Sequence, residues 1–230
     1  MPDATPLADL QNHATLQAPS AADAGVVPGR KRPKPGERRE QILQALASML
    51  ELPGGERITT AALAARLEVS EAALYRHFAS KAQMFEGLIE FIEQSVFTLV
   101  NQIVEREQLA NDGAADVGAR QAAKLIAMLM QFAEKNPGMA RVMVGDALVF
   151  ENERLLARMN QFFDKVEATL KQCFRVEVSA SGQDLSTMEP GVRASVLVAF
   201  VAGRLQRFVR SGFKRLPSER LDLSLRLILG

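Results

Sequence analysis

Residues 57–81 read RITTAALAARLEVSEAALYRHFASK, and this stretch decides the expected fold. Two short helical patterns are joined by a three-residue turn at 67–69. Ala64 is small enough to let the second helix cross the first closely and at a steep angle. This arrangement is a helix-turn-helix unit. The positions expected to face inward are Leu63, Ala64, Leu67, Ala73, Leu74 and Phe78.

The outward face of the second helix would then carry Ser70, Glu71, Ala72, Tyr75 and Arg76. A helix of this length fits the major groove of DNA, where the residues at its N-terminal end come nearest the base edges. Ser70 and Ala72 are therefore the candidates for base contact, Ala72 through a thymine methyl group.

Residues just before each helix are suited to capping it. A Thr59 or Thr60 hydroxyl can accept an orphan N–H of the first helix, and Ser70 can cap the second. The N-terminus of the first helix could also bind a DNA phosphate with the same N–H groups, so capping and DNA contact by Thr59 and Thr60 are compatible. Arg57 is expected to contact the DNA backbone.

The run Tyr75-Arg76-His77-Phe78-Ala79-Ser80-Lys81 and the surrounding segments ITTAALA and VSEAALYRHF resemble the DNA-binding domain of TetR-type regulators. The resemblance implies that Tyr75, His77 and Lys81 contact phosphates. From the residues alone, Tyr75 could be a surface aromatic, His77 a structural or capping residue, and Lys81 an ordinary residue at a helix start.

One position departs from that family's pattern. Glu68 stands in the turn where the family usually has glycine. If its backbone is left-handed, a side chain there costs on the order of 1 kcal/mol.

The resemblance continues over most of residues 36–215, towards nucleoid-occlusion members of the family. It implies sequence-specific DNA binding and, in the DNA-bound state, antagonism of the division protein FtsZ. A groove for the FtsZ tail would involve Phe91, with Met128, Lys135 and Asn136 as further lining residues. Phe91 lies roughly 100° from the centre of the apolar stripe of its helix, which suits an exposed anchor. It could instead pack on a neighbouring helix, and Asn136, before Pro137, could serve only as a cap.

Apolar periodicity elsewhere predicts an all-α chain with no convincing strand. Three domains are expected: a disordered tail and basic arm (1–35), the helix-turn-helix domain (36–82) and a helical dimerisation and partner-binding domain (83–230). The helices are predicted over 36–50, 81–107, 115–135, 153–175, 191–213 and 221–229, with short helices up to residue 150.

The helices 153–175 and 191–213 are long and amphipathic. They could form core within one chain, or a four-helix bundle with a second copy. A homodimer would suit a palindromic DNA site with two half-sites, and the family resemblance implies this mode of dimerisation.

The net charge of +1 hides an uneven distribution. Residues 1–27 carry three aspartates and no Lys or Arg, whereas residues 28–40 carry six basic and two acidic side chains. We expect this basic arm to follow the phosphate backbone or enter the minor groove, and so to steepen the salt dependence of binding.

Composition excludes several other classes. One cysteine and two histidines offer no metal spacing, and no cofactor motif or catalytic set is visible, so we expect neither a cofactor nor an enzyme. No apolar run reaches the roughly 18–20 residues of a membrane span, and no signal core is present, which predicts a cytoplasmic, nucleoid-associated protein. The alternative function is a ligand-responsive repressor, although the crowded helix 115–135 offers few polar groups for a ligand.

Overall fold

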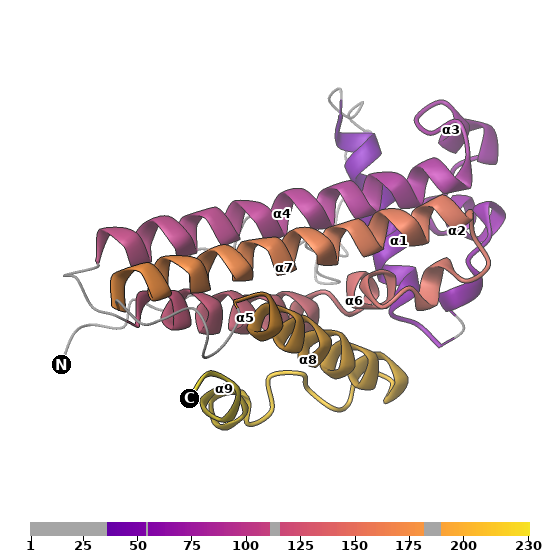
Figure 1. Cartoon of the computed structure of the whole chain (residues 1–230). Helices are drawn as coiled ribbons and strands as arrows, with labels where there is room; N and C mark the ends of the chain where they lie inside the picture. Colours follow the sequence, from indigo (N-terminus) through magenta and orange to yellow (C-terminus); the bar gives the residue numbers. More distant parts are fainter. Residues whose placement is uncertain (1–35, 54, 111–115, 182–189) are drawn as a thin grey trace, which may run out of the picture.

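The structure is a computed structural model that describes residues 36–53, 55–110, 116–181 and 190–230. Every regular element within those ranges is helical, so the expected all-α class is confirmed (Figure 1). The predicted tail and most of the basic arm (1–35) lie outside the described residues, and so do residues 182–189 of a polar loop expected near 179–190. The elements are α1 (Glu37–Leu50), η2 (Gly55–Arg57), α2 (Thr60–Arg66), α3 (Glu71–Tyr75), α4 (Lys81–Leu109), α5 (Val117–Lys135), α6 (Pro137–Met143), η3 (Asp146–Leu148), α7 (Glu153–Ser181), α8 (Pro190–Arg210) and α9 (Leu221–Leu229).

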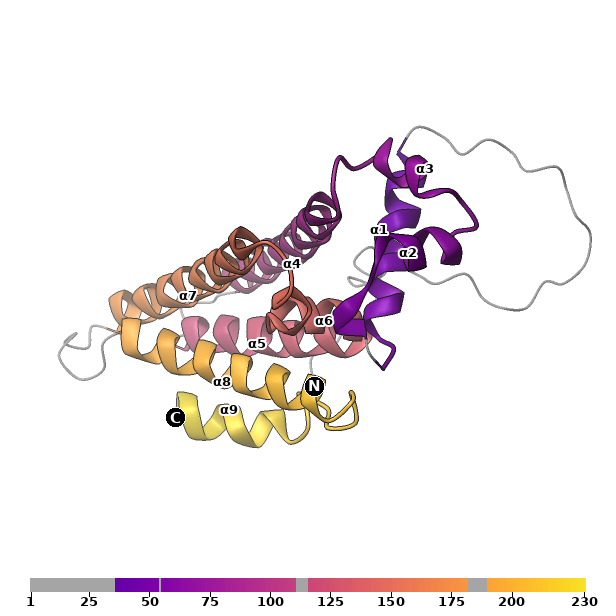
Figure 2. The ribbon, with the colours of Figure 1, turned by 90° about the vertical axis from the view of Figure 1, so that its right-hand side faces the viewer.

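The helices α1 to α3 form a small unit, called the head below, at one end of the long helix α4 (Figures 1 and 2). The predicted inward residues Leu63, Ala64, Leu74 and Phe78 are buried there, together with Leu46 and other α1 residues. The helix α2 begins after Thr59, whose Oγ1 accepts a hydrogen bond from the N–H of Ala62 at 3.1 Å. The sequence offered Thr59 and Thr60 as N-caps of this helix, and the structure shows that Thr59 is the cap.

The turn between α2 and α3 has a left-handed residue at Glu68, where the family usually has glycine. The φ of Glu68 is 52°, and the N–H of Val69 donates to the carbonyl of Ala64 at 3.0 Å. The turn therefore keeps its shape with a non-glycine residue at the strained position. The helix α3 ends at Tyr75, three residues before Phe78, where the pattern EAALYRHF predicts its end.

The body, comprising α4 to α9, is built around α5. This helix packs against α4, α7 and α8, and eleven of its nineteen residues are buried. The apolar stripe predicted on α4 is also buried, as are Leu155, Met159, Phe162, Val166 and Leu170 of α7. The helix α7 continues to Ser181, beyond its expected end near residue 175. Burial raises the pKa of the Cys173 thiol on α7 to about 11, which keeps it protonated and unreactive at neutral pH.

Head and body meet where α6 packs on α1. A Cβ added at Gly138 would lie 2.0 Å from the carbonyl oxygen of Ala47, so only glycine allows this approach. Arg141 of α6 donates from Nη1 to the carbonyl of Leu52 at 3.1 Å, just after α1 ends, and its guanidinium lies 5.2 Å from the centre of the Phe213 ring. One buried arginine thus joins the head, α6 and the segment after α8.

Candidate nucleic-acid interface

The outer face of α3 carries the residues expected there. Ser70, Glu71, Ala72, Tyr75 and Arg76 are all exposed, because the side that bears Leu74 is fixed in the core of the head. Ser70 occupies the N-cap position, but its side chain makes no capping hydrogen bond. This capping prediction was therefore wrong, and the hydroxyl remains at the surface next to the start of α3.

A hydrogen-bonded cluster links the start of α2 to the outer face of α3. Thr60 Oγ1 donates to Glu71 Oε2 at 2.6 Å, and the Tyr75 hydroxyl donates to Thr60 Oγ1 at 3.5 Å. Tyr75 is 46% exposed, and its hydroxyl can donate to a phosphate by giving up the long hydrogen bond to Thr60. Glu71 had no assigned role in the sequence. Its pairing with a residue eleven positions away has no local sequence signal.

The end of α3 is fixed by α1. The guanidinium of Arg39 lies 4.2 Å from the centre of the Phe78 ring and donates to the His77 carbonyl at 3.3 Å. His77 itself is exposed beside Arg76. Arg39, counted by charge in the basic arm, is therefore a residue of the folded head, while Arg38 donates to Gln41 within α1 at 3.0 Å.

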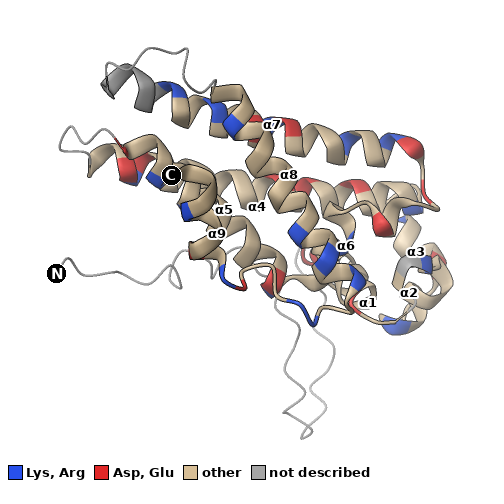
Figure 3. Ribbon diagram, turned by 60° about the horizontal axis from the view of Figure 1, so that its bottom comes forward, with Lys and Arg blue, Asp and Glu red and all other residues tan. Residues whose placement is uncertain are grey.

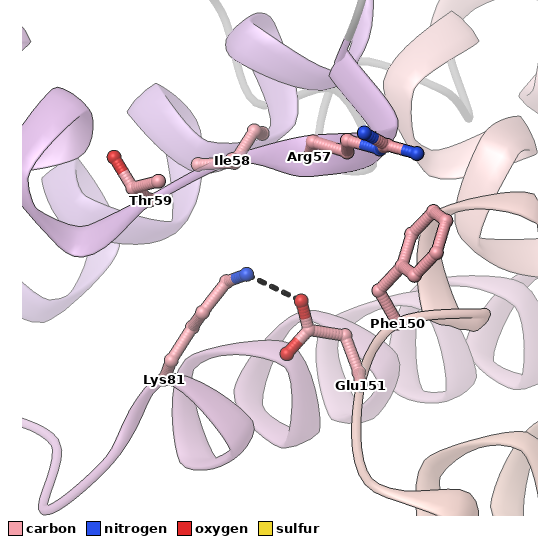
Figure 4. A pocket seen from close by; sticks show the side chains of 6 residues that line it. All are labelled: Arg57, Ile58, Thr59, Lys81, Phe150 and Glu151. Carbon is pink, nitrogen blue, oxygen red and sulfur yellow. Dashed lines mark hydrogen bonds and ion pairs between the residues drawn. The ribbon is translucent and has the colours of Figure 1, made fainter.

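Arg57 and Lys81 lie beside Phe150 and Glu151, which follow η3 (Figure 4). The Lys81 Nζ makes an ion pair with Glu151, and the Arg57 guanidinium lies 4.8 Å from the centre of the Phe150 ring. Together with Thr59, these residues line an open cavity of about 440 Å³ between head and body. Phosphate contact by Lys81 would therefore compete with Glu151, a partner 70 positions away that sequence reasoning missed.

The residues expected to bind a protein partner are divided between surface and interior. Met128 is 1% exposed and Asn136 is 5% exposed, and the Asn136 Nδ2 donates to the Phe132 carbonyl at 2.8 Å at the end of α5. Neither side chain lines an open groove. The alternative role of Asn136 as a cap is the one that this hydrogen bond fits. Phe91 is half-buried, packed against the core, and Lys135 is exposed.

Phe91 and Lys135 nevertheless lie at the same level of the body. The antiparallel helices α4 and α5 are registered by a Glu107–Arg120 ion pair and by a hydrogen bond from Gln121 to the Val104 carbonyl. Since both helices rise equally per residue, that register brings Phe91 level with residues 134–136.

Over the described ranges, no three His, Cys, Asp or Glu side chains gather as metal ligands would. In the same part of the chain, every helix is too short or too polar to cross a bilayer.

A helix-turn-helix head with an exposed, preorganised second helix, carried by an all-helical body, defines the class of helix-turn-helix DNA-binding regulators. Residues 42–88 match the family described as bacterial regulatory proteins of the TetR family. Residues 119–229 match a SlmA-like, tetracyclin repressor-like C-terminal domain.

Curated relatives extend the match across head and body. The nucleoid occlusion factor SlmA of Idiomarina loihiensis is 48% identical over 185 residues, covering 80% of this chain and 90% of the relative. The SlmA of Shewanella loihica is 50% identical over 182 residues, covering 79% and 88%. The chain therefore belongs to the SlmA family of TetR-type regulators, which are DNA-binding regulators and not enzymes.

Solved structures agree on the fold. The fatty acid degradation regulator FadR from Bacillus halodurans matches with a TM-score of 0.67 over 87% of this chain and 97% of its own, at 16% identity. FadR from Bacillus subtilis, solved in complex with stearoyl-CoA, matches with a TM-score of 0.65 over 83% and 97%, at 14% identity. At such identities the likeness concerns the fold alone.

Proposed function

We propose that this chain is a nucleoid occlusion factor: a homodimer that binds a palindromic DNA site on the chromosome and, when DNA-bound, antagonises FtsZ assembly. The observation that carries the proposal is identity near one half to SlmA proteins across both head and body. A TetR-type protein that shares only a DNA-binding head with its relatives would not support a shared action of the body.

For DNA contact we assign the outer face of α3 and the start of α2. Thr59, Thr60, Tyr75, Arg76 and His77 would hold phosphates, and Ser70 and Ala72 would meet base edges. The hydrogen bonds between Thr60, Glu71 and Tyr75 support the assignment, because they order exposed side chains before DNA arrives. Arg57 and Lys81 would reach the backbone only by leaving Phe150 and Glu151.

Dimerisation would cover the exposed apolar residues of α8 and α9. Val192 and Val196 of α8 are 54% and 48% exposed, and Leu223 and Leu227 of α9 are 57% and 88% exposed. Most apolar residues of α7 are already buried within the chain, although Leu156 is 43% exposed, so α9 is a better second helix for a four-helix bundle than α7. The proposed bundle therefore consists of α8 and α9 from each subunit, where the sequence predicted α7 and α8, and it keeps the twofold symmetry.

Matched leucines test the dimer. Leu227→Lys should convert the dimer to monomer in sedimentation velocity, because a twofold contact places the new charge twice in an apolar interface. Leu109→Lys, at a leucine that is 87% exposed on the far end of α4, should leave the dimer intact. A dimer that survives Leu227→Lys and Val196→Lys together would exclude this surface.

The FtsZ contact is assigned to the region around Phe91 and Lys135. The α4–α5 register that brings the two level supports this assignment, and Lys135 supplies a charge that an acidic peptide would favour. Asn136 would act from beneath by supporting the end of α5 at this level, and Met128, which the same register places level with residues 97–99, would support α5 further along the body.

The deciding experiment is sedimentation of purified FtsZ polymer with this protein, in the presence and absence of its DNA site. We expect less polymer only when DNA is present. Phe91→Asp should keep DNA binding and lose the effect on FtsZ. Lys135→Glu, which leaves the core untouched, should weaken it, whereas the control Lys171→Glu on α7 should not. If FtsZ polymer is unchanged with DNA bound, and a metabolite releases the DNA, the protein is a ligand-responsive repressor instead.

A further inference from the structure

The second half of α8 and the segment after it are strongly basic. Residues 204–220 contain six basic side chains and one acidic side chain, a local charge of +5 in a chain whose total is +1. The helix-turn-helix unit does not include this segment, and it lies outside the apolar positions assigned to the dimer.

Four of these cations form what we call the α8 basic cluster: Arg207, Arg210, Lys214 and Arg215. All four are exposed, and in the described part of the chain their side chains have no ion-pair or hydrogen-bond partner. Cations on α7 behave differently, since Arg154 pairs with Glu86 at 2.7 Å and Arg158 with Glu93 at 3.1 Å. In the described part of the chain, these two α7 cations are thus paired with acidic side chains of α4, whereas the four at the end of α8 are not.

The backbone that carries the cluster is fixed. Ser211 Oγ accepts from the N–H groups of Lys214 and Arg215, at 3.1 and 2.9 Å. The Phe213 ring packs edge-on against Phe208 with centroids 5.3 Å apart and lies under Arg141. A cluster on a fixed turn loses less conformational entropy on binding than one on a free tail.

The cluster lies on the head side of the body. The helix α8 runs so that its C-terminal end points towards the end of the molecule that carries the head (Figures 1 and 2). Arg141 makes the connection at atomic distance, since it contacts Phe213 and also donates to the Leu52 carbonyl of the head. In Figure 3 the blue of Lys and Arg recurs along the end of α8 and the following segment.

The chemistry of the cluster favours phosphate. Three of its four members are arginines, whose planar guanidinium binds phosphate oxygens bidentately and gives up its hydration more readily than an ammonium does. Arg207 and Arg210 also complement the dipole at the end of α8, but Lys214 and Arg215 lie beyond the helix, where the dipole gives no reason for them.

We propose that the α8 basic cluster is a second DNA-contact surface, which binds backbone phosphates of the duplex held by the heads, independently of base sequence. The inference rests on the proposed DNA-binding function. In the proposed dimer the two clusters would bring eight cations to the head side of the body, and phosphates would relieve their mutual repulsion. The heads would select the site, and the cluster would strengthen binding at any sequence.

The test is the salt dependence of DNA binding by the full chain carrying Lys214→Gln and Arg215→Gln. Because each neutralised phosphate adds about 0.9 to the slope of log K against log salt concentration, the slope should fall by about two to four for a dimer. Affinity should fall equally for the cognate duplex and a scrambled duplex. The control Arg106→Gln removes an exposed cation at the far end of α4, for which the described residues offer no ion-pair partner, and should change neither.

Three outcomes would contradict either the proposed function or the second DNA-contact surface. If the unaltered protein does not prefer its cognate duplex, the proposed function itself fails. If it does, but the double variant keeps the full salt slope, only the second DNA surface fails. The third outcome comes from binding to vesicles of equal parts phosphatidylglycerol and phosphatidylcholine. If the double variant loses vesicle binding while the salt slope of its DNA binding is unchanged, the cluster binds an anionic membrane, and the proposed DNA contact is wrong. Thermal unfolding of both variants should match that of the unaltered protein, since neither substitution removes a buried contact.

Discussion

The helices α3 and α5 are built in opposite ways. The helix α3 has five residues, of which Leu74 alone is buried, whereas α5 has nineteen, of which eleven are buried. A single helical turn is not stable by itself in water, so α3 depends on Leu74 beneath it, Thr60 at its side and Arg39 at its end. The comparison teaches that α3 is positioned by its neighbours, which leaves its outer side chains to serve recognition, while α5 holds the body together.

The largest effect is expected where head and body join. Gly138→Ala would push a methyl group into the Ala47 carbonyl, and overpacking of this kind costs about 1–3 kcal/mol. Urea unfolding at fixed protein concentration should show this loss, and DNA affinity should fall with it because the head moves. Gly203→Ala, where an added Cβ meets no atom within 4 Å, should be neutral or stabilise the helix by up to about 1 kcal/mol. If the two variants are equally stable, the contact between Gly138 and Ala47 can shift enough to admit a methyl group.

A change on α3 should separate recognition from stability. Tyr75→Phe removes one hydroxyl from the exposed face, and a hydrogen bond to a phosphate contributes about 1 kcal/mol per subunit. A dimer should then lose DNA affinity by roughly thirtyfold in a fluorescence anisotropy titration, while the free energy of unfolding stays within about 0.5 kcal/mol. Thr98→Val on α4 removes a hydroxyl from the body and should leave DNA affinity unchanged. Loss of stability without loss of affinity in Tyr75→Phe would reverse the roles assigned to the two regions.

The Lys81–Glu151 ion pair tests whether Glu151 restrains a lysine that is expected to contact a DNA phosphate. Glu151→Gln removes the competing charge, and a partly exposed pair contributes at most about 1 kcal/mol per subunit, so the DNA affinity of a dimer should rise by at most about thirtyfold and its salt slope should steepen. Lys81→Gln should lower affinity, with Glu151 intact or replaced. If Glu151→Gln weakens binding, the pair positions Lys81 for DNA and does not withhold it.

The smallest effect concerns the turn between α2 and α3. With Glu68 at a φ of 52°, glycine at this position should be more stable than alanine by about 1 kcal/mol. Comparing Glu68→Gly with Glu68→Ala in thermal unfolding cancels the loss of the glutamate side chain and isolates the backbone strain. An alanine variant as stable as the glycine variant would show that the turn can relax out of the left-handed region.

The sequence by itself determined the helices, the turn and the exposed face of α3. These features depend on interactions within about four residues, such as the cap that Thr59 makes with Ala62, and on apolar periodicity, which is visible in one dimension. The strained backbone at Glu68 was foreseeable for the same reason, because the turn geometry is local.

Tertiary structure alone decided which polar groups meet. Thr60 finds Glu71, Arg39 finds His77, and Lys81 finds Glu151 across 70 residues. It also placed Met128 and Asn136 in the interior and left the apolar residues of α8 and α9 at the surface. Side-chain periodicity tells which face of a helix is apolar, but whether another helix of the same chain covers that face depends on how the helices pack.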